Sequence, residues 1–412
     1  MLHTPPMQKP ARRLAPILIL GLWSFACRSG PGAGEGSGEP LAVGDPRKAE
    51  VSLPAQGDWR ATLVLDNTPT AGVWTVGVMK IFDHYACPEI VGIDDLGRCN
   101  VLWSYSGKWT PVTTVADGKW LGGLALADVD ERVPGRELYT GSQQGNLYEV
   151  VAYRNTLLDN RLIGMIPGRE IHTVVAADVD PGHRGPEVLV FTSPGGLYKA
   201  VPRQDGRDGF ELTLVEDLPG RIRDALVLAD GSSGPPEIAT IGRHGKLELL
   251  TWREGRPAWE TIFEAPMGMG RVARRPSAAG EGLVLYSTAD DGMIRRHERV
   301  ARGNWRHEVV YIGPPGPRGI AAGRFDVDPK RETVAVFGYS KTVELLTRQD
   351  GRWSSESVFV DTDKGHWITT GEVDGRNGTD ELVSSGYSGR IVLLARPPGF
   401  GLEAPAAARR QE

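Results

Sequence analysis

The sequence lacks the short motifs that mark the most common enzyme classes. It contains no G-x-S-x-G nucleophile elbow, no Walker phosphate-binding loop, no H-E-x-x-H metal motif and no Cys-x-x-Cys pair. Its eight histidines are scattered, and none pairs at the spacing of a helical metal site. These absences favour a binding or scaffold protein over an enzyme.

The chain also lacks an excess of positive charge. Its formal net charge is −5, and the part that follows Cys27 is more negative still, because Lys9, Arg12 and Arg13 precede that cysteine. A nucleic-acid surface needs clustered lysine and arginine, so we expect no nucleic-acid partner. The 53 glycines and 30 prolines favour many tight turns over long helices.

The N-terminal apolar run, residues 14–26, is too short to serve as a stable membrane anchor. Basic residues precede it, and Ser24-Phe25-Ala26-Cys27 ends it. This ending resembles a bacterial lipobox, in which a small residue precedes a cysteine that is cleaved and acylated, although Ser24 stands where that family prefers leucine. The resemblance implies that residues 1–26 are a signal peptide and that Cys27 carries the lipid. Plain secretion, with Cys27 incidental, is the alternative.

A Gly/Ser-rich segment, RSGPGAGEGSGEP, follows at residues 28–40 and is typical of a flexible tether. A lipid-anchored domain needs such a spacer to stand clear of the membrane, and we place the tether at 27–50. An aspartate directly after the lipidated cysteine would indicate inner-membrane retention, so Arg28 favours the outer membrane. The sequence thus predicts an exported, monomeric lipoprotein at the bacterial membrane.

Beyond the tether, one hairpin pattern recurs along the chain. Each copy is a short apolar run, a turn rich in Gly, Ser, Asp and Lys, and a second apolar run, which together indicate a β-hairpin. The seven copies are Glu89–Tyr105, Glu137–Tyr153, Glu187–Arg203, Glu237–Arg253, Leu283–Arg299, Thr333–Gln349 and Glu381–Pro397. A period of about fifty residues is typical of propeller blades.

Two further strand candidates flank each hairpin. A small-residue run that ends in an acidic turn precedes it, as in LGGLALADVD (121–130), and an edge-like strand follows it, as in FELTLVED (210–217). Alanine and glycine suit an innermost strand, where blades crowd the axis. We therefore predict an all-β fold, a seven-bladed β-propeller of four-stranded blades over residues 51–397, with a disordered tail at 398–412.

The last repeat lacks its outer strand, and the missing strand lies at the other end of the chain. Trp59–Thr68 matches Trp353–Thr362 in pattern. We therefore expect the N-terminal strand to complete blade seven, which closes the ring and removes an edge that would invite aggregation.

The acidic turns ADVD…GRELYTG, ADVD…GPEVLVF and GEVDGRNGTDELVSSG resemble the FG-GAP or VCBS-type repeats of bacterial surface propellers. Loops of that family often read D-x-D-x-D-G-x-x-D and bind calcium, because alternate side chains and a carbonyl surround one hard cation with oxygens. The resemblance implies the calcium-binding candidates Asp178, Asp180, Glu372, Asp374 and Asp380. Arg132 and Arg376 interrupt the pattern. The alternative is that the acids only shape Asx turns and accept backbone N–H bonds.

Aligning the innermost strands by their acidic turns places one residue of each strand at one mouth of the channel. These residues are Trp74, Gly122, His172, Asp224, Arg318 and His366, and blade five is too irregular to align. A ring that mixes His, Asp, Arg and Trp could bind a polar ligand or act as an acid–base site. We take Trp74, His172, Asp224, Arg318 and His366 as candidate ligand-binding residues. The alternative is a hydrated channel lined by whatever the pleat presents.

Cys87 and Cys99 are the two cysteines left once Cys27 is acylated. An oxidising compartment favours a disulfide between them. An ordinary hairpin over 89–94 and 98–103 would place them roughly 17 Å apart, whereas a disulfide needs Cα atoms within about 7 Å. The predicted structural disulfide therefore requires blade one to depart from a regular hairpin.

Together these features predict a membrane-anchored, extracytoplasmic propeller that serves as a binding or scaffold module for a protein or glycan partner. The alternative is an extracytoplasmic carbohydrate-active enzyme, a lyase or hydrolase, that uses the channel mouth. The fold does not decide between them, because propellers host both. No cofactor is expected apart from calcium in the acidic loops.

Overall fold

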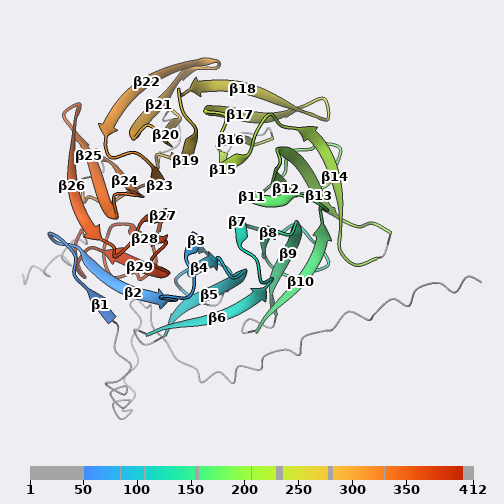
Figure 1. The fold of residues 1–412 in the computed structure, drawn as a ribbon, viewed down its shortest axis with the longest axis horizontal. Helices are drawn as coiled ribbons and strands as arrows, with labels where there is room; N and C mark the ends of the chain where they lie inside the picture. The colour runs from blue at the N-terminus through green and yellow to red at the C-terminus, as the bar shows by residue number, and fades with distance from the viewer. Residues whose placement is uncertain are drawn as a thin grey trace, which may run out of the picture.

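The chain folds into a ring of seven blades, each a four-stranded antiparallel sheet that runs outward from a central axis (Figure 1). The computed structural model describes residues 51–83, 85–105, 108–153, 157–205, 207–228, 235–276, 282–328 and 330–401. The predicted signal peptide, Cys27 and the tether lie outside these residues. The all-β, seven-bladed fold that the repeat predicts is confirmed.

The innermost strands line the axis, and the second strands follow them outward. The innermost strands are β3 (Val73–Met79), β7 (Leu121–Ala127), β11 (Glu170–Ala177), β15 (Ile222–Leu228), β19 (Met269–Arg274), β23 (Pro317–Gly323) and β27 (Gly365–Gly371). The second strands are β4 (Glu89–Asp94), β8 (Glu137–Ser142), β12 (Glu187–Ser193), β16 (Glu237–Gly242), β20 (Val284–Ala289), β24 (Glu332–Gly338) and β28 (Glu381–Gly386).

The third and outermost strands complete each blade. The third strands are β5 (Arg98–Tyr105), β9 (Asn146–Tyr153), β13 (Gly196–Pro202), β17 (Lys246–Arg253), β21 (Met293–Ala301), β25 (Thr342–Gln349) and β29 (Arg390–Ala395). The outermost strands of blades one to six are β6 (Lys108–Ala116), β10 (Leu157–Met165), β14 (Phe210–Asp217), β18 (Arg256–Glu264), β22 (Asn304–Ile312) and β26 (Arg352–Val360).

Strand β2 (Arg60–Asp66) closes the ring as the outer strand of blade seven. It pairs antiparallel with β29, with Thr62 opposite Leu393. The predicted closure is therefore confirmed. A short strand that the sequence did not reveal, β1 (Val51–Leu53), adds a fifth strand outside β2.

Apolar side chains fill the spaces between neighbouring blades. The second strands are buried on both faces, and every residue of β4, β8, β20 and β28 is buried. Small residues let the inner strands approach each other closely. A Cβ on Gly122 would lie 2.5 Å from the carbonyl oxygen of Ile171 in the next blade. The preference for alanine and glycine in these strands follows from this crowding.

A buried glutamate begins the second strand of several blades and fixes the acidic turn before it. Its carboxylate accepts a hydrogen bond from the backbone N–H eight residues earlier. The four pairs are Ile81–Glu89 at 2.7 Å, Val129–Glu137 at 2.8 Å, Val179–Glu187 at 3.0 Å and Val373–Glu381 at 2.6 Å. In blade six Thr333 takes this role, with its hydroxyl 3.4 Å from the N–H of Phe325.

Tryptophan–glutamate hydrogen bonds join the outer strands of adjacent blades. The indole N–H groups of Trp259, Trp305 and Trp353 donate to Glu216, Glu260 and Glu308 of the preceding blade, at 2.8, 3.0 and 3.1 Å. Trp305 and Trp353 therefore join neighbouring blades at their outer strands.

The predicted disulfide is not present in the structure. Cys99 lies in β5 opposite Ile93, near the turn of a regular hairpin, whereas Cys87 precedes β4 at the far end. The prediction was wrong because blade one keeps the ordinary hairpin that separates the two sulfurs.

The contacts of the propeller extend past the predicted boundary at Pro397. The N–H of Gly378 donates to the carbonyl oxygen of Phe400 at 2.7 Å, and the N–H of Gly399 donates to Arg376 at 2.8 Å. Residues 398–401 thus belong to the folded domain. Within the described part of the chain, no helix is long and apolar enough to cross a membrane.

Candidate binding site at the channel mouth

Every innermost strand carries a shift of register near its start, where one or two residues are not paired with the second strand. The single unpaired residue of five blades is Trp74, His172, Arg223, Arg318 or His366, whereas the shift is wider in blades two and five and leaves residues 123–124 and 270–271 unpaired. A β-bulge re-aims the side chain of the extra residue. The seven bulges therefore form a ring of equivalent positions at one mouth of the channel.

Four of the five predicted ligand-binding residues occupy this ring, and the fifth is displaced by one position. Asp224 pairs with Ile241, so Arg223 is the bulged residue of blade four. The alignment by acidic turns is therefore wrong by one residue in blade four, because it selects Asp224 in place of Arg223. The carboxylate of Asp224 instead contacts the next blade, where it accepts a hydrogen bond from the backbone N–H of Val272 at 3.0 Å.

Aromatic rings surround His366 on one side of the mouth. Its ring lies 4.4 Å from that of Trp74 and 6.0 Å from that of Tyr387, between centroids. The Nδ1 atom of His366 lies 2.6 Å from the carbonyl oxygen of Trp74. Burial, followed by the charge of Arg271, holds the pKa of His366 well below its ordinary value, so this imidazole is neutral.

His172 lies across the mouth in a second aromatic and cationic environment. Its ring is 4.6 Å from that of Trp120, and its Nε2 atom is 3.3 Å from the guanidinium of Arg221. Burial, then the charges of Arg221, Arg271 and Arg243, lowers the pKa of His172 to about 3. A group that stays neutral at ordinary pH is poorly suited to general acid–base catalysis, which requires a pKa near the working pH.

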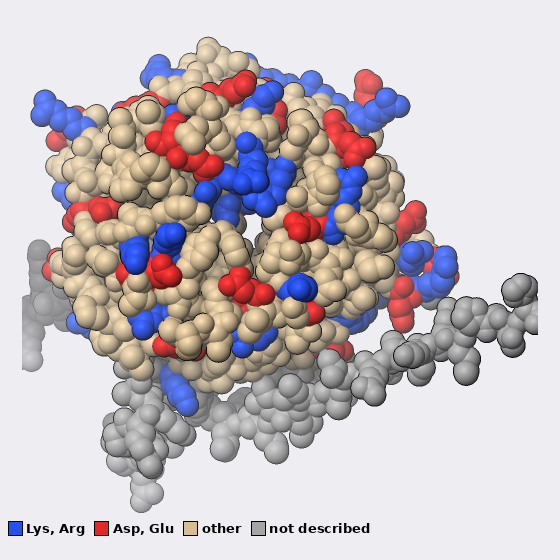
Figure 2. Space-filling view, viewed as in Figure 1, with Lys and Arg blue, Asp and Glu red and all other residues tan. Residues whose placement is uncertain are grey.

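Arginines from blades four to six converge between these two histidines. Arg223 and Arg318 share the carboxylate of Asp290, at 3.1 and 2.6 Å. Arg271 lies 4.2 Å over the ring of Trp367 and donates to the backbone oxygen of Gly270 at 2.8 Å. Figure 2 shows Lys and Arg side chains gathered at the rim of the central opening, beside the inner strands of these blades.

Sequence reasoning identified only Arg318 of this group and missed Arg221, Arg223, Arg243 and Arg271. The pattern Arg-x-Arg before the strand of blade four was the available signal. Arg271 lay in the one blade that could not be aligned, because the residues that follow its inner strand, RRPSAAG (274–280), contain no acidic turn.

A cavity of about 370 Å³ lies along the channel. Its walls are mainly small and apolar side chains of the inner strands, and Asp224, Arg271 and Trp367 are among its polar or aromatic lining residues. Burial raises the pKa of Asp224 to about 6. The channel therefore offers a mainly apolar chamber whose wall also carries ionisable groups.

The predicted calcium ligands of blade three, Asp178 and Asp180, do not belong to the cluster of carboxylates found among the described residues. The carboxylate of Asp180 forms an ion pair with Lys199 and accepts the N–H of Gly182 at 2.9 Å, whereas Asp178 is exposed. An ammonium group already neutralises the charge that calcium would need. In this loop Asp180 shapes the turn by accepting a backbone N–H bond.

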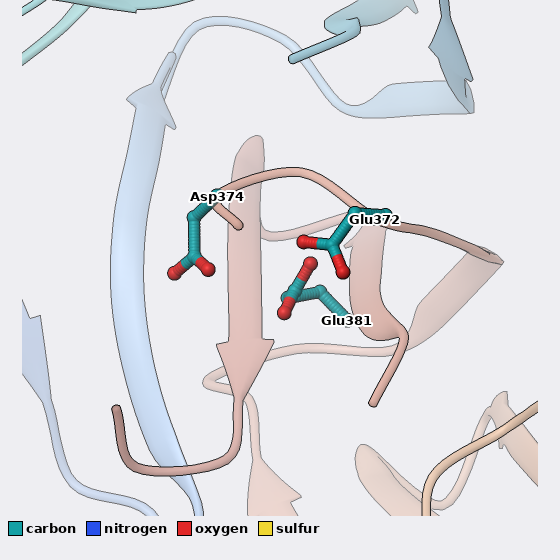
Figure 3. Close-up of side chains that lie close together, drawn as sticks. All are labelled: Glu372, Asp374 and Glu381. Atoms are coloured by element: carbon teal, nitrogen blue, oxygen red, sulfur yellow. The ribbon is translucent and has the colours of Figure 1, made fainter. Parts of the chain in front are cut away.

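Blade seven gathers three carboxylates, but one of them was not predicted. Ligand oxygens of Glu372, Asp374 and Glu381 lie within 4.8 Å of one another (Figure 3). Asp380 turns away and pairs with Arg324 at 3.0 Å. Each of the three carboxylates accepts an N–H bond within its own loop, from Gly375, Arg376 and Val373 respectively.

These bonds limit how well blade seven fits a calcium ion. Calcium takes six to eight oxygens, and an Asn377 side chain donates to the second oxygen of Glu381 at 2.9 Å. Burial raises the pKa of Glu381 to about 8, so the group is largely protonated at neutral pH. The three carboxylates suit a hydrogen-bonded turn better than a calcium cage.

Comparison with known proteins identifies the fold and no family. No protein-family model matches the chain, and no curated protein matches it. Among solved structures, the WD40 β-propeller domain of Doa1 superimposes with a TM-score of 0.53 at 12% sequence identity, over 82% of this chain and 97% of that one. At this identity the likeness shows the fold alone. The protein is a seven-bladed β-propeller.

Proposed function

We propose that the protein is a non-catalytic binding propeller that holds a protein or glycan partner against the channel-mouth face. The observation that carries this proposal is the ring of bulged residues, in which Trp74, His172, Arg223, Arg318 and His366 present polar and aromatic groups at one mouth. Binding sites of this kind combine an apolar wall with a few converging polar groups. The two neutral histidines favour recognition over proton transfer.

We further propose that it is a divergent bacterial surface propeller of the FG-GAP/VCBS type. The acidic turns that follow the inner strands support this relation. Their aspartates accept backbone N–H bonds, as Asp130 does from Arg132 at 3.1 Å and Asp374 from Arg376 at 2.8 Å. The turn has kept its shape while arginines replaced the residues that would complete a calcium site.

The same proposal places the propeller outside the cytoplasm, held at the membrane by a lipid on Cys27. The basic residues, apolar run and Gly/Ser-rich tether before residue 51 support it. Replacing Cys27 by Ser should abolish acylation and leave the protein unprocessed or released. Palmitate labelling that survives Cys27→Ser would rule out this anchor.

The enzyme alternative rests on Asp224, a buried carboxyl with a raised pKa beside the channel cavity. Its oxygens, however, accept the N–H groups of Val272 and Ala225, both at 3.0 Å. These bonds give Asp224 a structural task between blades four and five. A polysaccharide activity screen decides the matter, because turnover that Asp224→Asn abolishes would favour the enzyme.

The binding proposal is tested by recovering the partner from native membranes. We expect a partner to be recovered with the tagged wild-type protein and with Arg256→Gln, a change at the exposed first residue of β18. Recovery should be lost with the double variant His172→Gln/Arg318→Gln. An identical set of proteins and glycans from all three would refute the role of the channel mouth.

A further inference from the structure

We propose that the arginine cluster at the channel mouth, Arg221, Arg223, Arg243, Arg271 and Arg318, binds an oxyanion, a carboxylate or sulfate carried by the ligand. This inference rests on the proposed binding function, and it names the chemical group that the mouth recognises. Arginine suits the task because its planar fork of N–H donors matches the oxygens of such groups.

The cluster gathers more positive charge than the surrounding carboxylates neutralise. The guanidinium of Arg221 is repelled by Arg223, Arg243 and Arg318 and attracted by Glu170, and burial together with this repulsion lowers its pKa. Arg271 experiences the same imbalance. Burial lowers its pKa to about 10, with Asp224 opposing Arg223, Arg318 and Arg221. Like charges held together at partial burial cost free energy unless an anion compensates them.

The donors of the cluster are not used up by the protein. Among the described residues, the buried Nε atoms of Arg221 and Arg271 have no hydrogen-bond partner. Arg271 is only 7% exposed, so its unused donor lies within the channel wall rather than in bulk solvent. Buried donors are normally satisfied, so these two unpaired donors add to the free-energy cost of the cluster when no anion is bound.

Exposure falls along the cluster from the outside inward. Arg243 is exposed, the side chain of Arg318 is 17% exposed and that of Arg223 is 8% exposed. Arg271, at the inner end, lines the 370 Å³ cavity. An approaching anion would therefore meet a graded field that draws it into the mouth.

Exposed tyrosines beside Arg318 could also contact a larger group to which the anion is attached. Tyr339 and Tyr387 are 38% and 40% exposed, and Arg318 lies 5.0 Å over the ring of Tyr339. Exposed aromatic rings next to cations offer a surface to the ring of an acidic sugar. The oxyanion could therefore come from a free small anion or from a saccharide unit that carries one.

The experiment measures anion binding to the purified full-length mature protein by calorimetry at low ionic strength. The probes are sulfate, D-glucuronate and neutral D-glucose. We expect sulfate or glucuronate to bind and glucose not to bind. Similar affinities for the two anions assign the site to free oxyanions, and glucuronate binding at least tenfold tighter than sulfate assigns it to acidic sugars. Absence of binding by both anions overturns the proposal.

Two variants separate a ligand site from a structural cluster. Arg221→Gln/Arg243→Gln should weaken anion binding at least tenfold and raise the melting temperature without ligand, because repulsion is relieved. The control Arg256→Gln/Arg352→Gln removes the same charge at the starts of the outermost strands β18 and β26. It should change neither the anion affinity nor the melting temperature. A lowered melting temperature of the mouth variant, or unchanged affinity, overturns the proposal. Because this test needs no partner, it fails or succeeds independently of partner recovery from membranes.

Discussion

The carboxylate of Glu137 accepts a hydrogen bond from the backbone N–H of Val129 at 2.8 Å while lying wholly inside blade two. Its neighbour Tyr139 donates to the same carboxylate at 2.9 Å. Burial raises the pKa of Glu137 to about 7. The carboxyl group is therefore protonated over a pH range in which it would be ionised in the unfolded chain.

This shift predicts a pH-dependent stability. Because the folded pKa lies above the unfolded value, the contribution of Glu137 is complete below about pH 4.5 and is lost as pH rises through about 7. Glu137→Gln cannot ionise. We compare the free energy of unfolding of the variant with that of wild type at each pH. This difference should shift in favour of the variant by about 2 kcal/mol from pH 5.5 to pH 8. Denaturant unfolding at both pH values measures this, and a wild-type-to-variant difference that does not change with pH would contradict it.

Ring closure predicts a large effect of the first long strand. Deleting residues 51–68 removes β2 and leaves β29 without its outer partner, so the melting temperature should fall by ~10 °C or more. Deleting residues 51–54, which removes only β1, is the control and should have a small effect. If the longer deletion does not fold, Ala61→Pro provides the test, since Ala61 pairs with Leu394. An unchanged melting temperature in that variant would argue against closure.

The indole bonds between blades predict a measurable coupling. Trp353→Phe keeps an aromatic ring but loses the bond to Glu308. A double-mutant cycle of Trp353→Phe with Glu308→Ala should give a coupling of about 1 kcal/mol. Trp109→Phe is the control, because the indole nitrogen of Trp109 is buried without a partner in the described structure. Strict additivity in the cycle would show that the bond contributes nothing.

The acidic loop of blade seven predicts little response to calcium. Glu372, Asp374 and Glu381 already accept loop N–H bonds, so millimolar calcium should leave the melting temperature unchanged. A thermal shift with and without a chelator tests this. A rise with calcium that Asp374→Asn removes would establish a metal site instead.

The cysteines predict a distinctive thiol reactivity. Burial raises the pKa of Cys99 to about 12, so its thiol should not react with a thiol reagent at pH 8 in the folded protein. After unfolding without reductant, the acylated chain should titrate two thiols, from Cys87 and Cys99. Fewer than two would mean that a disulfide forms in the protein after all.

The sequence predicted the ring because its signals are local and repeated. Each hairpin carries its own turn residues, and the pattern of Trp59–Thr68 was enough to assign the closing strand. The binding site was harder to predict because it depends on register. One bulge shifted by a single residue moved the assignment from Arg223 to Asp224, and the lack of an acidic turn after the inner strand of blade five left Arg271 unassigned.

Burial was the other property that the linear pattern did not reveal. Glu137 and Glu381 look like ordinary polar strand starts, but both are completely buried, where they hold the preceding turn. Acid residues seldom lie in such places without partners. Their partners in the preceding turn are backbone N–H groups, which carry no sequence signal.

The pairing of β2 with β29 also constrains when the fold can form. When the chain is synthesised or exported from its N-terminus, β2 emerges first and its partner β29 emerges last. The two strands cannot pair until all the residues between them have emerged. Closing so long a loop is slow compared with forming the local hairpins. The individual blades can therefore form in sequence, but the finished disc appears only when the final strand arrives. A chain exported in the unfolded state would thus complete its native structure only after it has cleared the membrane.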